Sequence, residues 1–305
     1  MNDDHRLDPV NDAQVAMHGD ELPIDIVLVR RLLAEQLPHL AGRPLAMVRS
    51  TGTVNAICRI GNDLSVRLPR VAGWASDLTR ELEWLPKLAP LLSLPIPTPV
   101  AEGRPTSWYP YPWAVYRWLD GSPYEEALVR DERETARDLA GFIRELRRID
   151  IAGAPRGGRA PLRDLSDATI SAMKGSGDRI DVTAALAAWS RSTQTRPWDG
   201  NPVWIHGDLL PSNLLVKGGR LCAVIDFGGA GIGDPAADVV PAWSVFSRVG
   251  REAFREALDV DDDTWARARG YALHQAALII PYYPRTNPAF VAMAERTVAE
   301  VLADP

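Results

Sequence analysis

Two short segments in the second half of the chain carry the residue types that phosphoryl transfer requires. One runs from 206 to 213 and begins His-Gly-Asp, and the other is the Asp-Phe-Gly triplet at 226–228. Phosphoryl transfer needs a carboxylate near the attacking hydroxyl, oxygen ligands for magnesium and cations over the phosphates. Carboxylate and amide oxygens suit Mg²⁺, which keeps waters and phosphate oxygens as its other ligands. We therefore interpret Asp208 as the catalytic base, and Asn213 and Asp226 as metal ligands.

The spacing of these residues follows the catalytic loop of protein kinases, in which four residues separate the catalytic Asp from an Asn. An isolated Asp or Asn in a loop is as well explained by a side-chain turn. Here the loop, the Asn at this offset, a hairpin and the second Asp follow one another in the kinase order, after a strand-rich segment. The combination favours a kinase over a set of turns.

Two departures from protein kinases indicate a small acceptor. Gly207 stands where regulated protein kinases have an Arg that pairs with a phosphorylated activation loop. The short stretch between Gly228 and Gly233 leaves almost no room for such a loop. A protein substrate would normally dock along that segment. We therefore expect a small-molecule acceptor and constitutive activity, and we disfavour a protein kinase.

The composition is that of a globular protein without a nucleic-acid partner. The 305 residues carry a formal net charge of -6, and 46% of them are hydrophobic. A nucleic-acid-binding face requires clustered basic residues, and no apolar run approaches the roughly 20 residues that span a bilayer. The polar N-terminus resembles neither a signal nor a transit peptide. We expect a cytoplasmic protein without membrane or obligate protein partner, and we expect Cys58 and Cys222 to be buried free thiols.

Hydrophobic periodicity predicts an α+β fold with a strand-rich first part and a helical second part. Antiparallel strands are predicted from short apolar runs between turn residues, at 45–48, 56–60, 64–68, 98–101 and 114–118. Helices are predicted from apolar residues at helical spacing, at 24–36, 76–85, 133–149, 166–173, 182–192, 251–258, 263–280 and 288–302. Pro86 should end or kink the second of these helices, although Leu88 could extend its apolar face. A Gly-Gly pair at 218–219 predicts a hairpin of strands 214–217 and 221–225.

The chain resembles the aminoglycoside phosphotransferase (antibiotic kinase) family, which includes macrolide kinases and is related to choline kinase. The resemblance is carried by His-Gly-Asp with its Asn, by Ile-Asp-Phe-Gly, and by Gly-Asp-Pro-Ala-Ala-Asp at 233–238. It is most specific from Val203 to Trp243. It implies a protein-kinase-like two-lobed fold, with a small antiparallel-sheet N-lobe and a larger helical C-lobe. We place the N-terminal nucleotide-binding lobe at 21–118 and the catalytic and substrate-binding lobe at 119–305, after a flexible tail at 1–20.

The resemblance also implies the reaction. It is the transfer of a phosphoryl group from ATP or GTP, with Mg²⁺, to a hydroxyl of a small molecule. An aminoglycoside-type antibiotic is the leading acceptor, and a macrolide or a metabolite such as an amino alcohol or sugar is the alternative. A catalytically silent nucleotide-binding protein is a further alternative, which the intact Asp208, Asn213 and Asp226 disfavour.

By the same resemblance, a cation on the third strand and a Glu on the following helix bind the nucleotide phosphates. The usual cation is lysine, but the first lobe has no lysine before Lys87, so Arg67 must fill this role and steady the transferred phosphate. Guanidinium binds phosphate through two donors with a geometry unlike that of an ammonium, and an exposed strand arginine is the alternative reading. Glu81 is the implied helix partner, with Glu83 as the competing choice.

The remaining implied residues lie in a loop, a hinge and the support of the catalytic loop. Ser50, Thr51 and Gly52 would cover the phosphates. Backbone groups of Arg117 and Leu119 would meet the base. His206 and Asp238 would brace the catalytic loop. For Asp238 the alternative is an ordinary carboxylate in the first turn of a helix.

The acceptor-binding residues cannot be assigned from these motifs. A polycationic acceptor would require convergent carboxylates, for which the candidates are Asp259, Asp261, Asp262, Asp263 and Glu295. The run at 261–263 is better interpreted as an N-cap and first-turn cluster. Four further residues could line a pocket but are better interpreted as core, namely Tyr271, His274, Tyr282 and Tyr283.

Overall fold

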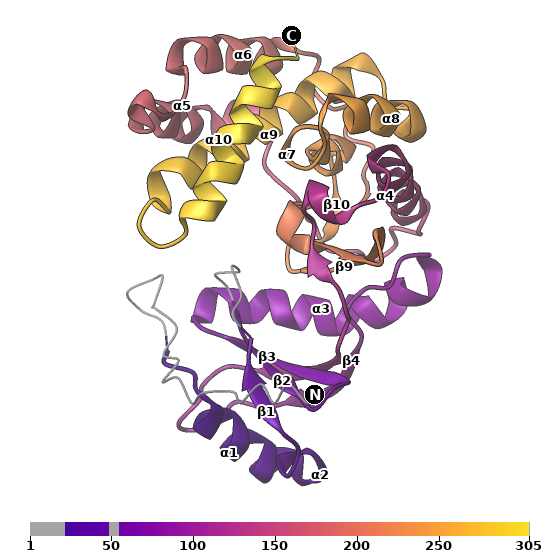
Figure 1. Ribbon diagram of the computed structural model, residues 1–305, viewed down its shortest axis with the longest axis vertical. Coiled ribbons are helices and arrows are strands. Elements are labelled where there is room, and N and C mark those ends of the chain that lie inside the picture. Colours follow the sequence, from indigo (N-terminus) through magenta and orange to yellow (C-terminus); the bar gives the residue numbers. More distant parts are fainter. Residues whose placement is uncertain (1–21, 49–54, 305) are drawn as a thin grey trace, which may run out of the picture. The chain divides into compact units, whose positions relative to one another are not determined.

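The structure is a computed structural model that describes residues 22–48 and 55–304. The chain forms two compact units, which are coloured along the sequence in Figure 1. The sheet unit comprises Met1–Ala75 and Val100–Tyr116, and the helical unit comprises Ser76–Pro99 and Arg117–Pro305. The tail predicted over 1–20 lies outside the described residues.

The sheet unit contains a five-stranded sheet with the strand order β1-β2-β3-β5-β4. Its strands are β1 (Leu45–Met47), β2 (Asn55–Ile60), β3 (Leu64–Pro69), β4 (Pro99–Gly103) and β5 (Trp113–Arg117). The pairs β1–β2 and β2–β3 are antiparallel, as predicted. Along β2, burial alternates with side-chain direction, because successive residues of a strand face opposite sides of the sheet.

The described part of the sheet unit also contains the α-helices α1 (Ile26–Gln36) and α2 (Pro38–Ala41) and a 3-10 helix at Ala72–Trp74. The chain enters α1 at Asp25, whose Oδ1 accepts a hydrogen bond from the Leu28 N–H at 2.8 Å. This N-cap satisfies one of the free N–H groups of the first turn. Val29, Leu32 and Leu33 are buried on the face of α1 that joins the core of the sheet.

The helical unit is built from helices with short strands among them. Its helices are α3 (Ala75–Leu88), α4 (Glu132–Arg147), α5 (Ser166–Gly175), α6 (Val182–Gln194), α7 (Pro241–Ser244), α8 (Arg248–Leu258), α9 (Asp262–Tyr282) and α10 (Pro288–Leu302). Its strands are β6 (Ser122–Pro123), β7 (Val203–Ile205), β8 (Leu214–Lys217), β9 (Arg220–Val224) and β10 (Gly231–Gly233). The chain is therefore α+β, as predicted.

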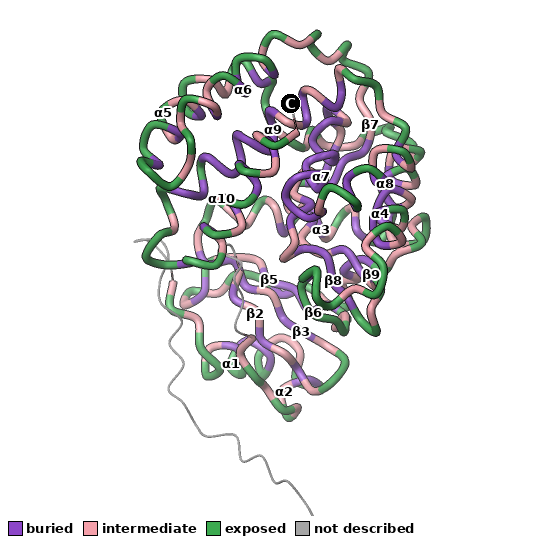
Figure 2. Tube along the Cα trace, turned by 45° about the horizontal axis from the view of Figure 1, so that its top comes forward, coloured by how far each residue is buried: buried purple, intermediate pink, exposed green. Residues whose placement is uncertain are grey.

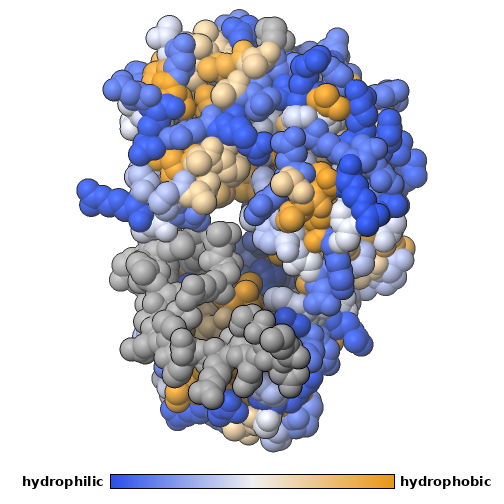
Figure 3. All heavy atoms as spheres, in the orientation of Figure 1, coloured by the Kyte–Doolittle hydropathy of each residue, from blue (hydrophilic) through white to orange (hydrophobic). Residues whose placement is uncertain are grey.

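Each unit buries its own apolar residues in a core. Figure 2 shows buried residues along β2, β3 and β5 of the sheet unit and along α7 and α9 of the helical unit. The outer face over α4 and α8 is mostly hydrophilic in Figure 3. Within the described residues, no helix combines the length and apolar character that a membrane span requires.

The predicted hairpin and the predicted helix break had different outcomes. β8 and β9 pair antiparallel around Gly218 and Gly219, which both have positive φ, so the hairpin is confirmed. α3 does not end at Pro86 but continues to Leu88, and Leu85 and Leu88 are both buried, so the alternative that Leu88 extends the apolar face is confirmed. Burial of this apolar face outweighs the lost backbone hydrogen bond. Cys58 is buried as predicted, whereas Cys222 is only partly buried.

Candidate active site

The carboxylate of Asp208 lies in the loop that follows β7 and is held from two sides. Asn213 Nδ2 donates to the Asp208 backbone oxygen at 2.8 Å and to Oδ2 at 3.1 Å. Gln275 Nε2, from α9, donates to Oδ1 at 2.7 Å. These contacts fix both the position and the rotation of the carboxylate. Such preorganisation is what a base needs when it must meet a hydroxyl in one orientation.

A backbone hydrogen bond joins the second predicted loop to the first. The Ile225 N–H donates to the Asn213 backbone oxygen at 2.9 Å. The next residue, Asp226, has φ 69°, a left-handed conformation that Asp and Asn tolerate better than most residues. The turn places Asp226 close enough to Asp208 that its negative charge raises the pKa of the Asp208 carboxyl. The structure thus brings together the three residues that the motif predicted.

The pKa of Asp208 is raised above its ordinary value. Burial is the main cause, and the charge of Asp226 adds to it. The Arg159 guanidinium and the Gln275 hydrogen bond lower the pKa in part. Two carboxylates kept close together in a protein destabilise each other, and cations such as those of a nucleotide–metal complex relieve the repulsion.

Asp238 and His206 form a buried brace beneath the catalytic loop. Asp238 Oδ2 accepts from the His206 N–H at 2.8 Å, and Oδ1 accepts from the Gly207 N–H at 2.7 Å. His206 Nδ1 accepts from the Asp208 N–H at 3.2 Å, so Nε2 carries the ring proton and donates to the Ile225 oxygen at 3.0 Å. The brace thereby ties the Asp208 loop to the Asp226 loop.

Replacing Asp238 by Asn is expected to lower the free energy of unfolding by about 1–3 kcal/mol, the cost of one buried donor without an acceptor. Both carboxylate oxygens accept from backbone N–H groups, and an amide offers only one oxygen. Urea unfolding measures the change. Asp181→Asn is the matched control, because Asp181 caps α6 through one bond and Asn caps equally well. Equal stability of the two variants would contradict the brace.

Gly207 is required by the shape of the loop. Its φ is 80°, and a Cβ added there would lie 3.3 Å from the Gly158 Cα and from the Gly229 oxygen. The segment at 156–158 therefore packs directly on the catalytic loop. The sequence predicted neither a helix nor a strand for this segment, which lies between the predicted helices 133–149 and 166–173.

Helix α3 contacts the Asp226 turn within the helical unit. Arg80 Nη1 donates to the Gly228 oxygen at 2.7 Å, and the rings of Trp84 and Trp204 lie 5.0 Å apart. Asp77, on α3, lies near this turn. Burial raises the pKa of Asp77, and the negative charge of Asp226 raises it further. α3 is thus fixed to the element that carries Asp226.

The two glutamates that competed for the helix role differ in burial. Glu81 is 3% exposed, whereas Glu83 is exposed and pairs with Lys87 at 3.1 Å. Arg67, on β3 of the sheet unit, is half-buried, with its guanidinium carbon 5.5 Å from the centroid of the Tyr116 ring. Arg67 is therefore not an exposed strand arginine. Its role and that of Glu81 stay predictions.

The structure describes some of the other predicted nucleotide residues, whose roles stay predictions. Ser50, Thr51 and Gly52 lie outside the described residues. The Arg117 N–H already donates to the Thr98 oxygen at 2.9 Å, so it is not available to a base. Leu119 is half-buried. Of the two backbone groups of Arg117, only the carbonyl oxygen can then contact a nucleotide base.

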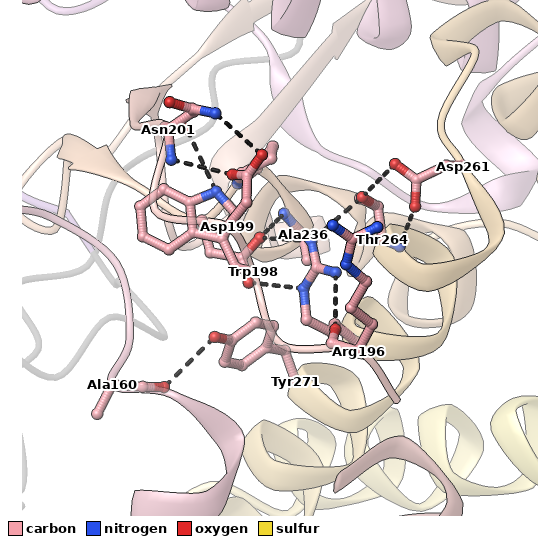
Figure 4. A network of polar contacts seen from close by, with 12 residues as sticks. Ala160, Arg196, Trp198, Asp199, Asn201, Ala236, Asp261, Thr264 and Tyr271 are labelled. Atoms are coloured by element: carbon pink, nitrogen blue, oxygen red, sulfur yellow. Dashed lines mark hydrogen bonds and ion pairs between the residues drawn. The ribbon is translucent and has the colours of Figure 1, made fainter. Parts of the chain in front are cut away.

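Two residues near Asp208 were not predicted. Gln275 lies on α9, 67 residues further along the chain, and no local pattern marks it. Arg159 lies in the loop before α5, and its Nη2 is 4.0 Å from Asp208 Oδ1. Arg159 also lines a cavity of about 640 Å³ within the helical unit. Part of the wall of this cavity, around Trp198 and Tyr271, is drawn in Figure 4.

Comparison with known proteins decides the family. A profile of the phosphotransferase enzyme family matches residues 49–271, which is more than half of the chain. The chain belongs to this family. Its sequence is 31% identical, over 210 residues, to an aminoglycoside 3'-phosphotransferase of Streptomyces fradiae. This match covers 63% of this chain and 68% of the relative.

Solved structures of other phosphotransferases share the fold. The GDP complex of a substituted aminoglycoside 2'-phosphotransferase IIIa has a TM-score of 0.70 at 22% identity and covers 92% of this chain and 98% of that one. A macrolide 2'-phosphotransferase from Brachybacterium faecium has a TM-score of 0.58 at 21% identity, with 93% and 99% covered. The predicted kinase-like fold, the family and the enzyme class are confirmed. This phosphotransferase is an enzyme that phosphorylates a small molecule.

Proposed function

We propose that this phosphotransferase moves the terminal phosphoryl group of ATP or GTP to a hydroxyl of a small molecule, with Asp208 as the base. The observation that carries the proposal is the fixed Asp208 carboxylate, held at 2.7 Å by Gln275 and at 3.1 Å by Asn213. The acceptor hydroxyl approaches Asp208, gives up its proton to the carboxylate and attacks the phosphorus. The nucleoside diphosphate leaves on the opposite side.

Asn213 and Asp226 are the residues that would hold Mg²⁺. Asn213 Nδ2 is engaged by Asp208, which directs the amide oxygen away from that contact. Among residues 22–48 and 55–304, no three His, Cys, Asp or Glu side chains converge as a metal cage. Mg²⁺ is usually held by one or two protein oxygens together with phosphates and water. The pair therefore fits Mg²⁺, which would neutralise phosphate charge during transfer.

We also propose roles for the residues that bind the nucleotide. Arg67 steadies the phosphates, Glu81 is the second charged residue that serves the nucleotide, and the segment 50–52 covers the phosphates. Arg117 and Leu119 offer backbone groups to the base. Apart from Leu119, the nucleotide-binding residues then lie within 21–118, and Asp208, Asn213 and Asp226 lie within 119–305. A solved relative holds GDP, which supports a purine nucleotide without choosing between ATP and GTP.

Constitutive activity is part of the proposal. In protein kinases the activation loop and the helix that carries the Glu control the site. Here Arg80 and Trp84 fix α3 to the Asp226 turn and to β7. The segment from Gly228 to Gly233 enters β10 at once. The enzyme is therefore expected to work without prior phosphorylation.

The test is acceptor-dependent release of ADP or GDP. The names of its relatives make an aminoglycoside-type antibiotic the first acceptor to screen, followed by macrolides, amino alcohols and sugars. We expect at least one acceptor to raise diphosphate release above the rate without acceptor, and only with Mg²⁺ present. Tight nucleotide binding without turnover on any acceptor would favour a catalytically silent protein instead.

A further inference from the structure

The cavity beside the catalytic loop carries an unusual excess of positive charge. Its lining includes Arg156, Arg159 and Arg163 from the segment before α5, with the aromatic rings of Trp198 and Tyr271. Its volume of about 640 Å³ is within the range of small-molecule sites. All of its lining residues belong to the helical unit.

The positive charge of these three arginines is not balanced by acidic residues in the cavity lining. Asp234 is the only acid among the described lining residues, and it is occupied. Arg267 Nε donates to Asp234 Oδ2 at 2.9 Å and Nη2 donates to Oδ1 at 3.2 Å, with both side chains buried. The charges of Arg267 and Asp234 therefore cancel, and the pair forms part of the cavity lining without adding net charge. Figure 4 shows the network around it, in which Tyr271 reaches the Ala160 oxygen and Asp261 caps α9 at Thr264.

Arg159 lines the cavity and also lies beside the proposed catalytic base, Asp208. Its Nη2 forms an ion pair with Asp208 Oδ1 at 4.0 Å, a separation beyond hydrogen-bond distance. Within residues 22–48 and 55–304 its guanidinium donates no hydrogen bond. Burial lowers the pKa of Arg159, and a guanidinium keeps its charge in proteins even so. A partly buried cation with free donors is stabilised by an anion that accepts two of them.

Three of the five acids that could bind a polycationic acceptor have partners elsewhere, and neither Asp259 nor Asp263 lines the cavity. Asp261 accepts from the N–H and the hydroxyl of Thr264 at 2.7 and 2.9 Å, so it is an N-cap as predicted. Asp262 pairs with Arg255, and Glu295 pairs with Arg179 at 2.8 Å. Asp259 ends α8 in a left-handed conformation. None of these acids lines the cavity.

We propose that this cavity selects an acceptor that carries a carboxylate or phosphate group near the hydroxyl that is phosphorylated. The proposal rests on the proposed function and names its acceptor class. Arg159 binds the anionic group, and Arg156 and Arg163 add positive potential. The hydroxyl then faces Asp208, which takes its proton. The oxygen–phosphorus bond to the acceptor forms as the bond to the leaving diphosphate breaks. Polycationic aminoglycosides are disfavoured by the same charges.

The test uses sugars that share the glucose ring and differ in the charge of one substituent, which is at C6 in the anionic sugars and at C2 in glucosamine. Glucuronate carries a carboxylate, glucose 6-phosphate a phosphate, glucose no charge and glucosamine an ammonium, and kanamycin is the polycationic comparison. Binding to the full-length protein is measured by calorimetry, and turnover by diphosphate release. We expect glucuronate or glucose 6-phosphate to bind at least about tenfold more tightly than glucose, and glucosamine and kanamycin to bind more weakly than glucose.

Variants separate the cavity from general surface charge. R159Q should reduce the preference for the anionic sugar over glucose by about tenfold or more, and R156Q and R163Q by smaller factors. R133Q is the matched control, because Arg133 is exposed near the start of α4, away from the cavity, and loses the same charge. Added salt should weaken the preference, because it screens the exposed arginines.

Three results would overturn the proposal: equal or tighter binding of glucosamine or kanamycin, no measurable binding of either anionic sugar, or the same preference in R159Q and R133Q. Failure of the proposed function is distinguishable from these results. It would appear as the absence of Asp208-dependent turnover with every acceptor, whereas efficient turnover of kanamycin would overturn only the acceptor class.

Discussion

The Asp208→Ala variant is expected to turn over about 10²- to 10⁴-fold more slowly than the wild type, the range that a positioned proton acceptor contributes. Both oxygens of this carboxylate are fixed, one by Gln275 at 2.7 Å and one by Asn213 at 3.1 Å. The variant removes the base but leaves Asn213 and Asp226 in place. Nucleotide affinity should therefore change little. Single-turnover kinetics and nucleotide calorimetry separate the two effects.

The control for this experiment is Asp262→Ala, which removes an exposed acid that pairs with Arg255 on the surface. Its turnover should equal that of the wild type. Burial and Asp226 raise the pKa of Asp208, so the ionised carboxylate destabilises the folded chain at neutral pH when no cation is bound. The melting temperature of Asp208→Ala without ligands should therefore not fall. Retained turnover in a folded Asp208→Ala protein would exclude Asp208 as the base.

The residues of the catalytic loop could be predicted because their chemistry is encoded at short range. Asp208 and Asn213 lie on one loop, and the hairpin between β8 and β9 returns the chain so that Asp226 meets them. Turn residues and strand periodicity both leave a trace in the sequence. The same local signals predicted the N-cap at Asp261.

The partners of Asp208 could not be predicted, because tertiary packing places them. Gln275 lies on a helix whose burial pattern gives no sign that one polar residue faces a carboxylate. Arg159 lies in an irregular loop that acquires its position from the close contact of Gly158 with Gly207. Contacts of this kind depend on which segments pack together, and a single sequence does not carry that information.

Short strands were missed for a related reason. β7 and β10 have three residues each and pair around Trp204 and Ile232. Three residues are too few for an alternating pattern to stand out from its surroundings. Their pairing nevertheless sets the geometry of the site, because β7 leads directly into His206 and β10 follows the Asp226 turn.

The charge of the proposed acceptor-binding cavity depends on which residues lie together in the structure. It cannot be read from which charged residues are adjacent in the sequence. Asp261, Asp262 and Asp263 are adjacent in sequence, yet the first caps α9 and the second pairs on the surface. Arg156, Arg159 and Arg163 are spread over a loop, yet they line one cavity. The acidic net charge of the chain therefore says nothing about the charge of its binding cavity.

The Asp226→Asn variant is expected to lower turnover by about 10²-fold or more, because a metal ligand supports several kcal/mol of transition-state charge stabilisation and each 1.36 kcal/mol is a factor of about ten. Asp226 has φ 69°, which Asn adopts readily, so this substitution removes the charge and leaves the turn intact. Asp226→Ala would add backbone strain and confound the result. The variant should also need a higher Mg²⁺ concentration for half-maximal turnover.

A Mg²⁺ titration of turnover at fixed nucleotide concentration measures both effects. Asp178→Asn is the matched control, since Asp178 is exposed and lies in the segment between α5 and α6. If Asp226 supports the metal, its Asn variant alone shifts the Mg²⁺ dependence. Asp208→Ala should instead lower the maximum without moving the midpoint, because its carboxylate acts on the acceptor. An unchanged midpoint in Asp226→Asn would assign the metal to other oxygens, and the two loops would then not divide proton transfer and metal binding between them.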